Sequence, residues 1–129
     1  MLTIELPWPP RELSPNARVH WTAKAESSQT AKAQGCYLMM GLMQSHDWIK
    51  DEPIYVVGKD CEATYTFHPP DKRKRDIDNF LAMMKNYQDG VCAALGIDDS
   101  RIKRTVIEWG AVVKGGKVTL RLEEICQSS

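Results

Sequence analysis

A run of large apolar side chains at helical spacing is the feature that most constrains the fold of this chain. Between residues 79 and 95 such side chains recur every three or four positions, at Phe80, Met84, Tyr87, Val91 and Leu95. This spacing gives a helix one apolar stripe, which a sheet or another helix must cover. Gly96 follows directly, and glycine is favoured where a helix ends in a left-handed residue. We therefore expect a helix from residue 79 to about residue 95, packed on a second element.

The first half of the chain predicts further elements of a small mixed domain. Residues 2–6 alternate apolar and polar side chains, as a half-buried strand does. Residues 21–45 are rich in Ala, Lys, Gln and Met and predict a long helix, although Gly35 and Gly41 lower its helical propensity. Residues 54–67 hold β-branched and aromatic residues around a break at 58–60, so we expect one or two strands there.

Two more strands are expected in the last third of the chain, at residues 106–113 and 118–123. The Lys114-Gly115-Gly116-Lys117 segment between them predicts a β-hairpin. The resulting order, β-α-β(β)-α-β-β, predicts the α/β (mixed α+β) class, with two helices packed on a small mixed sheet. A chain of 129 residues is long enough for one core and too short for two, so we expect a single domain over residues 1–129.

Charge, cysteine and hydropathy patterns exclude several classes of protein. The formal net charge is zero, so the chain as a whole has no general attraction for a polyanion. The cysteines lie far apart, with neither Cys-x-x-Cys nor a nearby pair of histidines, which predicts neither a zinc site nor a disulfide framework. No segment has the length of a membrane span or the pattern of a secretory leader. We therefore expect a cytoplasmic protein without a membrane partner.

An unusual charge pattern carries the functional argument: Arg75-Asp76-Ile77-Asp78-Asn79, preceded by Lys72-Arg73-Lys74. Two carboxylates two residues apart point the same way from an extended backbone, so they can share one hard divalent ion. The adjacent cations suit the phosphate backbone of a nucleic acid, and they are Lys72, Arg73, Lys74 and Arg75. A metal ion beside a phosphate backbone is typical of a nuclease.

Two further groups extend this pattern along the expected helix. Lys85 and Asp89 follow Asp78 by about two and about three helical turns, so the three side chains would share one helical face. A carboxylate with a lysine two turns away suits a metal ion and the charge that develops on a phosphodiester. Asp98 and Asp99 come directly after the end of this helix, and that position makes an otherwise ordinary turn pair of interest.

Simpler interpretations exist for each of these groups. An aspartate is favoured at a helix N-terminus, but a cap explains one of Asp76 and Asp78 better than both together with a basic run. Lys85 can instead form an exposed i,i+4 pair with Asp89. An EF-hand loop is excluded, because it would need a ligand in place of Phe80 and a glycine at position 81.

The remaining aromatic, histidine and methionine positions give weaker signals. Trp8 and Trp109 are expected in the core rather than as base-stacking platforms. His20 and Trp21 are a weak hint of a loop on the substrate side, while a structural role is the ordinary expectation for a histidine. The Met-rich segment 36–43 is a candidate dimer interface, although core packing explains it more simply.

In these residues the chain resembles the RusA family of Holliday-junction endonucleases, common in phages and prophages. The resemblance covers nearly the whole chain and rests on the joint order of Leu6-Pro-Trp-Pro-Pro10, Ser14-Pro-Asn-Ala-Arg-Val-His-Trp21, Pro69-Pro-Asp-Lys-Arg-Lys-Arg-Asp-Ile-Asp-Asn79, Gly96-Ile-Asp-Asp-Ser-Arg101 and Lys114-Gly-Gly-Lys117. It implies a homodimer that cuts four-way DNA junctions by Mg²⁺-dependent hydrolysis, with Mn²⁺ as a substitute, in DNA recombination and repair. The implied setting is a bacterial or phage-infected cell.

The resemblance also implies roles for particular residues. Asp76 and Asp78 match the two aspartates of the family's Asp-x-Asp-Asn element, and Asp99 matches its third acid, so the three are the implied catalytic metal ligands. Some members place a catalytic lysine four residues after the second aspartate, where this chain has Ala82. Lys85, about one helical turn further on, is the candidate here. The basic run before Asp76 is expected to hold the DNA backbone.

Other functions stay open at this point. A nuclease of the same fold can act mainly on flaps or forks rather than on four-way junctions. A non-catalytic DNA-binding protein can keep the fold without the activity, and the displaced lysine is compatible with it. An interaction protein whose acids only cap a helix would show no affinity for Mg²⁺ or Mn²⁺, so metal binding separates it from the others.

Overall fold

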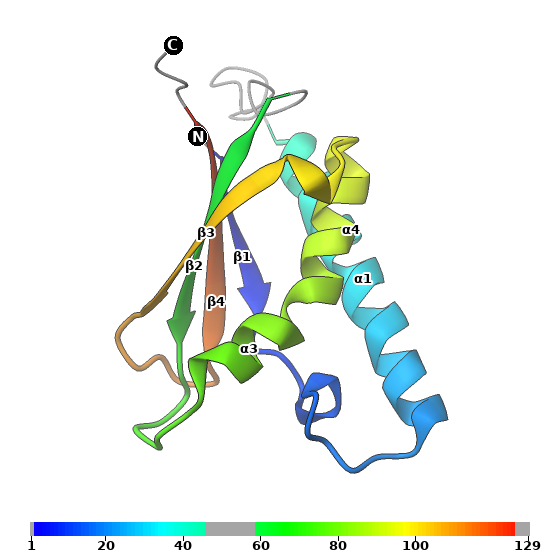
Figure 1. The fold of residues 1–129 in the computed structure, drawn as a ribbon, viewed down its shortest axis with the longest axis vertical. Helices are drawn as coiled ribbons and strands as arrows, with labels where there is room; N and C mark the ends of the chain where they lie inside the picture. The colour runs from blue at the N-terminus through cyan, green and yellow to red at the C-terminus, as the bar shows by residue number, and fades with distance from the viewer. Residues whose placement is uncertain (1, 46–58, 126–129) are drawn as a thin grey trace.

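The three-dimensional structure is a computed structural model, which describes residues 2–45 and 59–125. Within these residues, one four-stranded sheet is built from β1 (Leu2–Pro7), β2 (Cys61–His68), β3 (Ile102–Trp109) and β4 (Lys117–Glu124). The α-helices of the same residues are α1 (Trp21–Met43), α3 (Ile77–Met83) and α4 (Lys85–Leu95), and the short 3-10 helices are η1 (Arg11–Leu13) and η3 (Asp99–Arg101). Both α1 and α4 cover the same face of the sheet (Figure 1). Together these elements form a single mixed α+β domain, as the sequence predicts.

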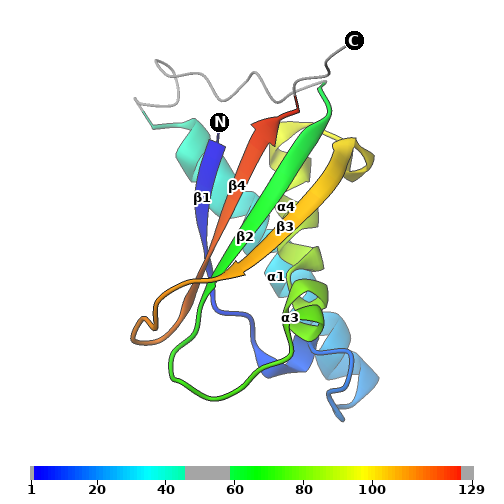
Figure 2. The same ribbon diagram turned by 60° about the vertical axis from the view of Figure 1, so that its left-hand side comes forward.

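The sheet is mixed, and its strands do not follow chain order. From edge to edge the order is β1-β4-β2-β3. β4 runs antiparallel to both β1 and β2, whereas β2 runs parallel to β3. Figure 2 shows β4 and β2 in the middle of the sheet, with the helices behind it. No helix within residues 2–45 and 59–125 is both long enough and apolar enough to cross a membrane.

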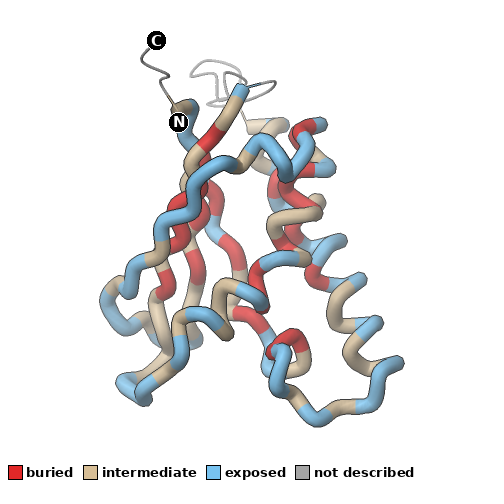
Figure 3. The backbone as a smooth tube through the Cα atoms, viewed as in Figure 1, coloured by how far each residue is buried: buried red, intermediate tan, exposed pale blue. Residues whose placement is uncertain are grey.

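The core lies between the helices and one face of the sheet (Figure 3). On β4 the side chains of Val118, Leu120 and Leu122 are at most 1% exposed, and they alternate with more exposed positions, as a strand with one covered face requires. Opposite this face lies the apolar stripe predicted from the helical spacing. Met84, Tyr87, Val91 and Leu95 are buried, and Phe80 packs partly buried against them. Gly96 ends α4 at a φ of 76°, which confirms the left-handed terminus.

Two glycines let α1 and α4 cross with their backbones in contact. A Cβ atom added at Gly35 would lie 3.0 Å from the carbonyl carbon of Tyr87 and closer still to its oxygen. A Cβ atom at Gly90 would lie 2.7 Å from the amide nitrogen of Cys36 and closer still to the carbonyl oxygen of Lys32. Gly35, which lowers helical propensity in the sequence, and Gly90 are therefore both required for the close packing of the two helices, whereas Gly41 makes no such contact among the described residues.

The predicted hairpin is wrong. The two strands that flank the Gly-Gly turn, β3 and β4, do not pair, because β2 lies between them and bonds to both. β2 has an almost continuous buried pattern and takes a central position, which places β3 on the edge. The connection over residues 110–116 therefore passes the end of β2 instead of forming a tight turn. Gly110 N donates to Phe67 O (2.8 Å), and His68 Nδ1 donates to Ala111 O (2.9 Å).

The single helix expected from residue 79 to about residue 95 is divided. Met84 separates α3 from α4, and its amide donates to Leu81 O (3.1 Å), so the last turn of α3 is tightened. Met83 and Met84 are both buried, and the tighter turn lets two consecutive side chains enter the core. The predicted strand 2–6 and helix 21–45 are confirmed as β1 and α1. Of the one or two strands expected at 54–67, β2 is confirmed, and residues 54–58 lie outside the described residues.

Candidate nucleic-acid interface

The two aspartates of the Asp76-Ile77-Asp78-Asn79 segment lie together at the start of α3. Asp76 is the N-cap residue, and its Oδ1 accepts a hydrogen bond from the amide of Asp78 (3.1 Å). Asp78 lies in the first turn, and both side chains are exposed. The capping interpretation therefore holds for Asp76 but uses only one of its oxygens. Among the described residues no hydrogen bond or ion pair engages the Asp78 carboxylate, which leaves it available for a ligand.

Asn79 connects this acidic start to the N-terminal segment of the chain. The buried Ser14 hydroxyl donates to Asn79 Oδ1 (3.2 Å), and Lys24 Nζ donates to the carbonyl oxygen of Ser14 (3.2 Å). Two segments 65 residues apart in the sequence therefore meet beside Asp78. Spacing along the chain gives no sign of this contact between the Ser14-Pro-Asn and Asp-x-Asp-Asn motifs, so it was not predictable from the sequence.

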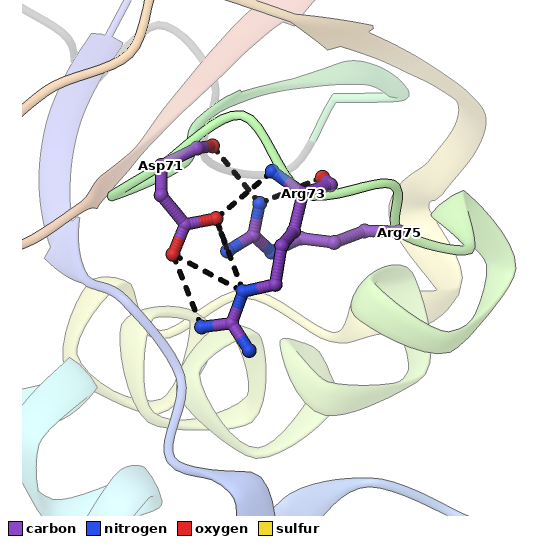
Figure 4. A network of polar contacts seen from close by, with 3 residues as sticks. All are labelled: Asp71, Arg73 and Arg75. Atoms are coloured by element: carbon purple, nitrogen blue, oxygen red, sulfur yellow. Dashed lines mark hydrogen bonds and ion pairs between the residues drawn. The ribbon is translucent and has the colours of Figure 1, made fainter.

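Asp71 organises the basic segment 72–75 that precedes the two aspartates (Figure 4). Its carboxylate pairs with Arg73 (Nη2–Oδ2, 3.1 Å) and with Arg75 (Nη2–Oδ1, 2.7 Å). These hydrogen bonds, those from Arg73 above all, hold the pKa of Asp71 well below its usual range. The segment is thus folded around one acid instead of being an extended run of four free cations.

The two arginines are engaged to different degrees. The Arg75 side chain is only 11% exposed, donates to the carbonyl oxygens of Asp71 (3.1 Å) and Arg73 (3.0 Å), and lies 5.5 Å from the centre of the Trp8 ring. Its guanidinium is largely used in holding the segment in shape. Arg73 is 81% exposed and keeps donors free toward solvent.

Lys72 and Lys74 are the cations that this arrangement leaves unpaired. Both side chains are exposed, and neither forms an ion pair with any residue in the described part of the chain. Of the four cations predicted to contact DNA, these two lysines and the outer edge of Arg73 are thus the groups presented to solvent. Ammonium groups at this place suit phosphate oxygens as point charges.

An open groove lies on each side of the basic segment. The first, of about 430 Å³, reaches the start of α3 and is lined partly by apolar side chains such as Trp8 and Phe80 and partly by polar and basic ones, among them Arg11, Ser14, Lys74, Arg75 and Asn79. The second, of about 420 Å³, is bounded by the basic segment on one wall and by Trp109 and Val112 on the other. The sequence argument did not identify Arg11 as part of this surface, since an isolated arginine carries no positional signal.

Lys85 and Asp99 form a separate pair at the other helix. The Lys85 Nζ lies 3.8 Å from Asp99 Oδ2, with both side chains substantially exposed, so the pair contributes little to stability. Lys85 therefore pairs with Asp99, and the alternative pair with Asp89 is absent from the ion pairs of the described residues. Asp98 caps η3 by accepting from the amide of Ser100 (2.9 Å), and this hydrogen bond lowers the pKa of Asp98.

The structure does not bring the three predicted acids together as one group. Asp76 and Asp78 lie at the N-cap and in the first turn of α3, whereas Asp99 follows α4; the start of α3 and the end of α4 are far apart in Figure 1. Within residues 2–45 and 59–125, no cluster of three or more His, Cys, Asp or Glu side chains is arranged to hold a metal ion. Because the helix is divided at Met84, the common face expected for Asp78, Lys85 and Asp89 is also not continuous. The sequence argument for a shared ion placed Asp76 and Asp78 on one extended backbone, whereas in the structure Asp76 is the N-cap and Asp78 lies in the first turn of α3.

Comparison with known proteins gives a relative that matches over the whole chain. An uncharacterized protein of Xylella fastidiosa is 34% identical over 129 residues, which is 100% of this chain and 80% of that protein. The venom peptide isomerase heavy chain of Agelenopsis aperta is 35% identical over 66 residues, but the match covers only 45% of this chain and 27% of that protein. The chain matches no protein-family model. It belongs to the same family as the Xylella fastidiosa protein.

Proposed function

We propose that this protein is a Mg²⁺-dependent endodeoxyribonuclease that acts on branched DNA as a homodimer. The observation that carries the proposal is the exposed pair Asp76 and Asp78 directly beside the basic segment 72–75. Carboxylates bind a hard cation and lysines bind phosphate, so the two groups together match a metal ion and the backbone it would contact. The resemblance to RusA resolvases adds the four-way junction as the expected substrate and DNA recombination and repair as the expected role.

The proposed metal site uses the exposed carboxylates of Asp76, the N-cap of α3, and Asp78, in its first turn. Mg²⁺ is commonly held in proteins by one or two carboxylates, while waters and substrate phosphates fill the rest of its shell. Asp76 keeps one carboxylate oxygen outside its capping bond, and Asp78 keeps both. When bound, such an ion activates water and stabilises charge on the scissile phosphate. Mn²⁺ has the same preference for oxygen ligands and should substitute.

The chain's own residues then have distinct tasks. Lys72, Lys74 and Arg73 would hold the DNA backbone, and Arg75 would keep the segment folded so that these cations point outward. Lys85 would supply a positive charge on the α4 side, where its present partner is Asp99. This pair is weak and exposed, so a phosphate can replace the carboxylate as the partner of the ammonium group.

The homodimer is proposed from symmetry. A four-way junction has two-fold symmetry, and a two-fold dimer presents two equivalent sites to it, which suits paired cuts. The zero formal net charge offers little electrostatic resistance to association.

Cleavage of a substrate panel tests this function. A labelled four-way junction, a flap and a linear duplex are incubated with the wild type and Mg²⁺ or Mn²⁺, alongside Asp78→Asn and, as a matched control, Glu26→Gln on the exposed face of α1. We expect symmetric cuts in the junction by the wild type and Glu26→Gln, and none by Asp78→Asn, with binding kept or tightened because a charge that repels phosphate is lost. Cutting by Asp78→Asn at the wild-type rate would overturn the proposal, and preference for the flap would reassign the substrate.

A second candidate is a DNA-binding protein without catalysis. Two observations favour it: the described residues form no three-carboxylate group, and Ala82 occupies the nearer lysine position of the resemblance. This candidate predicts salt-dependent binding of the junction with no cutting in either metal. The same panel therefore separates the two functions.

A further inference from the structure

The second groove, between the basic segment and the end of β3, combines cations with an exposed aromatic ring. Trp109 is the last residue of the edge strand β3 and is 41% exposed, and Val112 beside it is 45% exposed. The remaining wall of this groove of about 420 Å³ is formed by Pro69 and the segment 71–75. The sequence argument expected Trp109 in the core, but its position at the edge of the sheet leaves much of the ring uncovered.

The Trp109 ring is anchored rather than loose. Its centroid lies 5.6 Å from that of Phe67 and 5.9 Å from that of Phe80, in tilted and edge-on contacts that account for its buried part. The backbone that follows is tied to the end of β2, where Gly110 N donates to Phe67 O (2.8 Å) and Val113 N donates to Pro69 O (3.0 Å). The exposed part of the ring is therefore held at a fixed place next to the basic segment, which lowers the entropy cost of binding.

This combination matches one class of ligand. Lys72 and Lys74 are exposed and have no ion-pair partner among the described residues, and phosphate oxygens suit them. A nucleobase presents a flat π-face that stacks on tryptophan. Bases inside a duplex are already stacked on their neighbours, so the groove suits a base that is unpaired or unstacked, as in a single-stranded arm or at a branch point.

We propose that this groove binds an unpaired nucleobase of branched DNA, stacked on Trp109, with the neighbouring phosphates on Lys72 and Lys74. The inference rests on the proposed binding of branched DNA, but it does not require that the protein cuts it. It assigns to the groove the recognition of unpaired strands, in addition to the sequence-independent attraction for the backbone.

Binding assays without divalent metal separate this contact from cleavage. Fluorescence anisotropy in EDTA compares a labelled oligothymidylate with a blunt duplex for the wild type, Trp109→Leu, Trp109→Phe and the control Val106→Ala. Val106 lies on the same edge strand β3, is 38% exposed and does not line the groove. We expect Trp109→Leu to weaken binding of the oligothymidylate by about 5-fold or more and that of the duplex by less than about 2-fold. The salt dependence should not change, since no charge is removed.

The other variants complete the design. Trp109→Phe keeps an aromatic face and should retain most of the affinity, and Val106→Ala should match the wild type. Equal losses on the duplex and the oligothymidylate, or no loss on either, would overturn the inference. If the junction is cut while binding is independent of Trp109, this inference fails and the proposed function stands. If single strands bind through Trp109 but nothing is cut, the inference stands and the nuclease proposal fails.

A second measurement guards against a folding defect in Trp109→Leu, because the ring contacts Phe67 and Phe80. Intrinsic tryptophan fluorescence is titrated with the same oligothymidylate, using wild type and Trp109→Phe. A base stacked on an indole quenches it, so the quenching of the wild type should be largely lost in Trp109→Phe although that variant still binds. Equal quenching in both proteins would contradict stacking on Trp109.

Discussion

A single methyl group added at Gly90 should destabilise the protein, because α1 and α4 cross there with their backbones in contact. The Cβ atom of Gly90→Ala would lie 2.7 Å from Cys36 N and 2.9 Å from the carbonyl carbon of Lys32, closer than the 3.4 Å at which ordinary contact begins. Both atoms belong to the backbone of α1, so no side chain can rotate away. The two helices would have to move apart, and this would loosen the packing of the buried side chains of Tyr87 and Val91.

The size of the effect follows from two opposing terms. Overpacking of a well-packed core typically costs about 1–3 kcal/mol, and contact with the backbone of α1, which cannot rotate away, places Gly90→Ala at or above the upper part of that range. Alanine returns about 0.8–1 kcal/mol through its higher helical propensity. We therefore expect a net loss of about 2 kcal/mol. In Gly35→Ala the added Cβ atom meets the carbonyl group of Tyr87, so we expect a similar loss in the free energy of unfolding.

Gly41→Ala is the matched control, because it makes the same chemical change in α1. Apart from the chain neighbours and the backbone of α1 itself, no atom of the described residues lies within 4 Å of the added Cβ. It should stabilise the protein by about 0.5–1 kcal/mol through helical propensity and the unfolded state. Urea unfolding followed by far-ultraviolet circular dichroism gives the free energies of unfolding. If Gly90→Ala were as stable as Gly41→Ala, the inferred helix contact would be refuted.

Three further predictions follow from the polar groups. Replacing Lys72 and Lys74 by Ala should lower the slope of log binding constant against log salt by about 2, since each phosphate contact contributes about 0.9. Arg75→Ala should instead mainly lower the melting temperature, because Arg75 holds the segment in shape. An unchanged slope in anisotropy titrations of the double lysine variant would contradict the lysine assignment. Because the pKa of Asp71 is held below its usual range, its contribution to stability should be present above about pH 4 and lost as the pH falls toward the lowered value. Asp71→Asn should therefore show a weaker loss of melting temperature between pH 5 and pH 2 than the wild type, and parallel losses would be the contrary result. Burial raises the pKa of the Cys92 thiol to about 12, so iodoacetamide at pH 8 should label Cys92 far more slowly in the native protein than in urea. Peptide mass spectrometry measures the two labelling rates, and equal rates would mean that the thiol is accessible in the native protein.

Local signals predicted the parts of the fold that depend on neighbours in the sequence. The stripe that includes Tyr87 and Val91 and the glycine at position 96 were enough to predict a helix, its buried face and its end. The strand order was not predictable in this way. A Gly-Gly turn between two strands favours a hairpin locally, but the central place taken by β2 depends on which strand best fills the core, a long-range competition that outweighs the turn.

In the candidate site, too, local patterns were predictable from the sequence and contacts between distant segments were not. The neighbouring acids Asp76 and Asp78 and the basic run were visible as a pattern, and the structure keeps them together. The four cations are engaged to different degrees because Asp71 pairs with Arg73 and Arg75, and the sequence pattern did not predict these pairs. The meeting of Ser14 with Asn79 and the exposure of Trp109 arise from contacts between distant segments and from a place at the sheet edge, so composition and spacing carry no sign of them.

Metal binding at the start of α3 is the measurement that most directly separates a metal site from a helix cap. Free Mn²⁺ is followed by electron paramagnetic resonance while wild type, Asp78→Asn and Glu26→Gln are added, with and without a four-way junction. If the carboxylates hold a cation, the wild type and Glu26→Gln should remove Mn²⁺ from solution, and more strongly when the junction supplies phosphate ligands. Asp78→Asn should stay folded but should not remove Mn²⁺. No uptake by the wild type, or the same uptake by Asp78→Asn, would show that the aspartates only cap the helix.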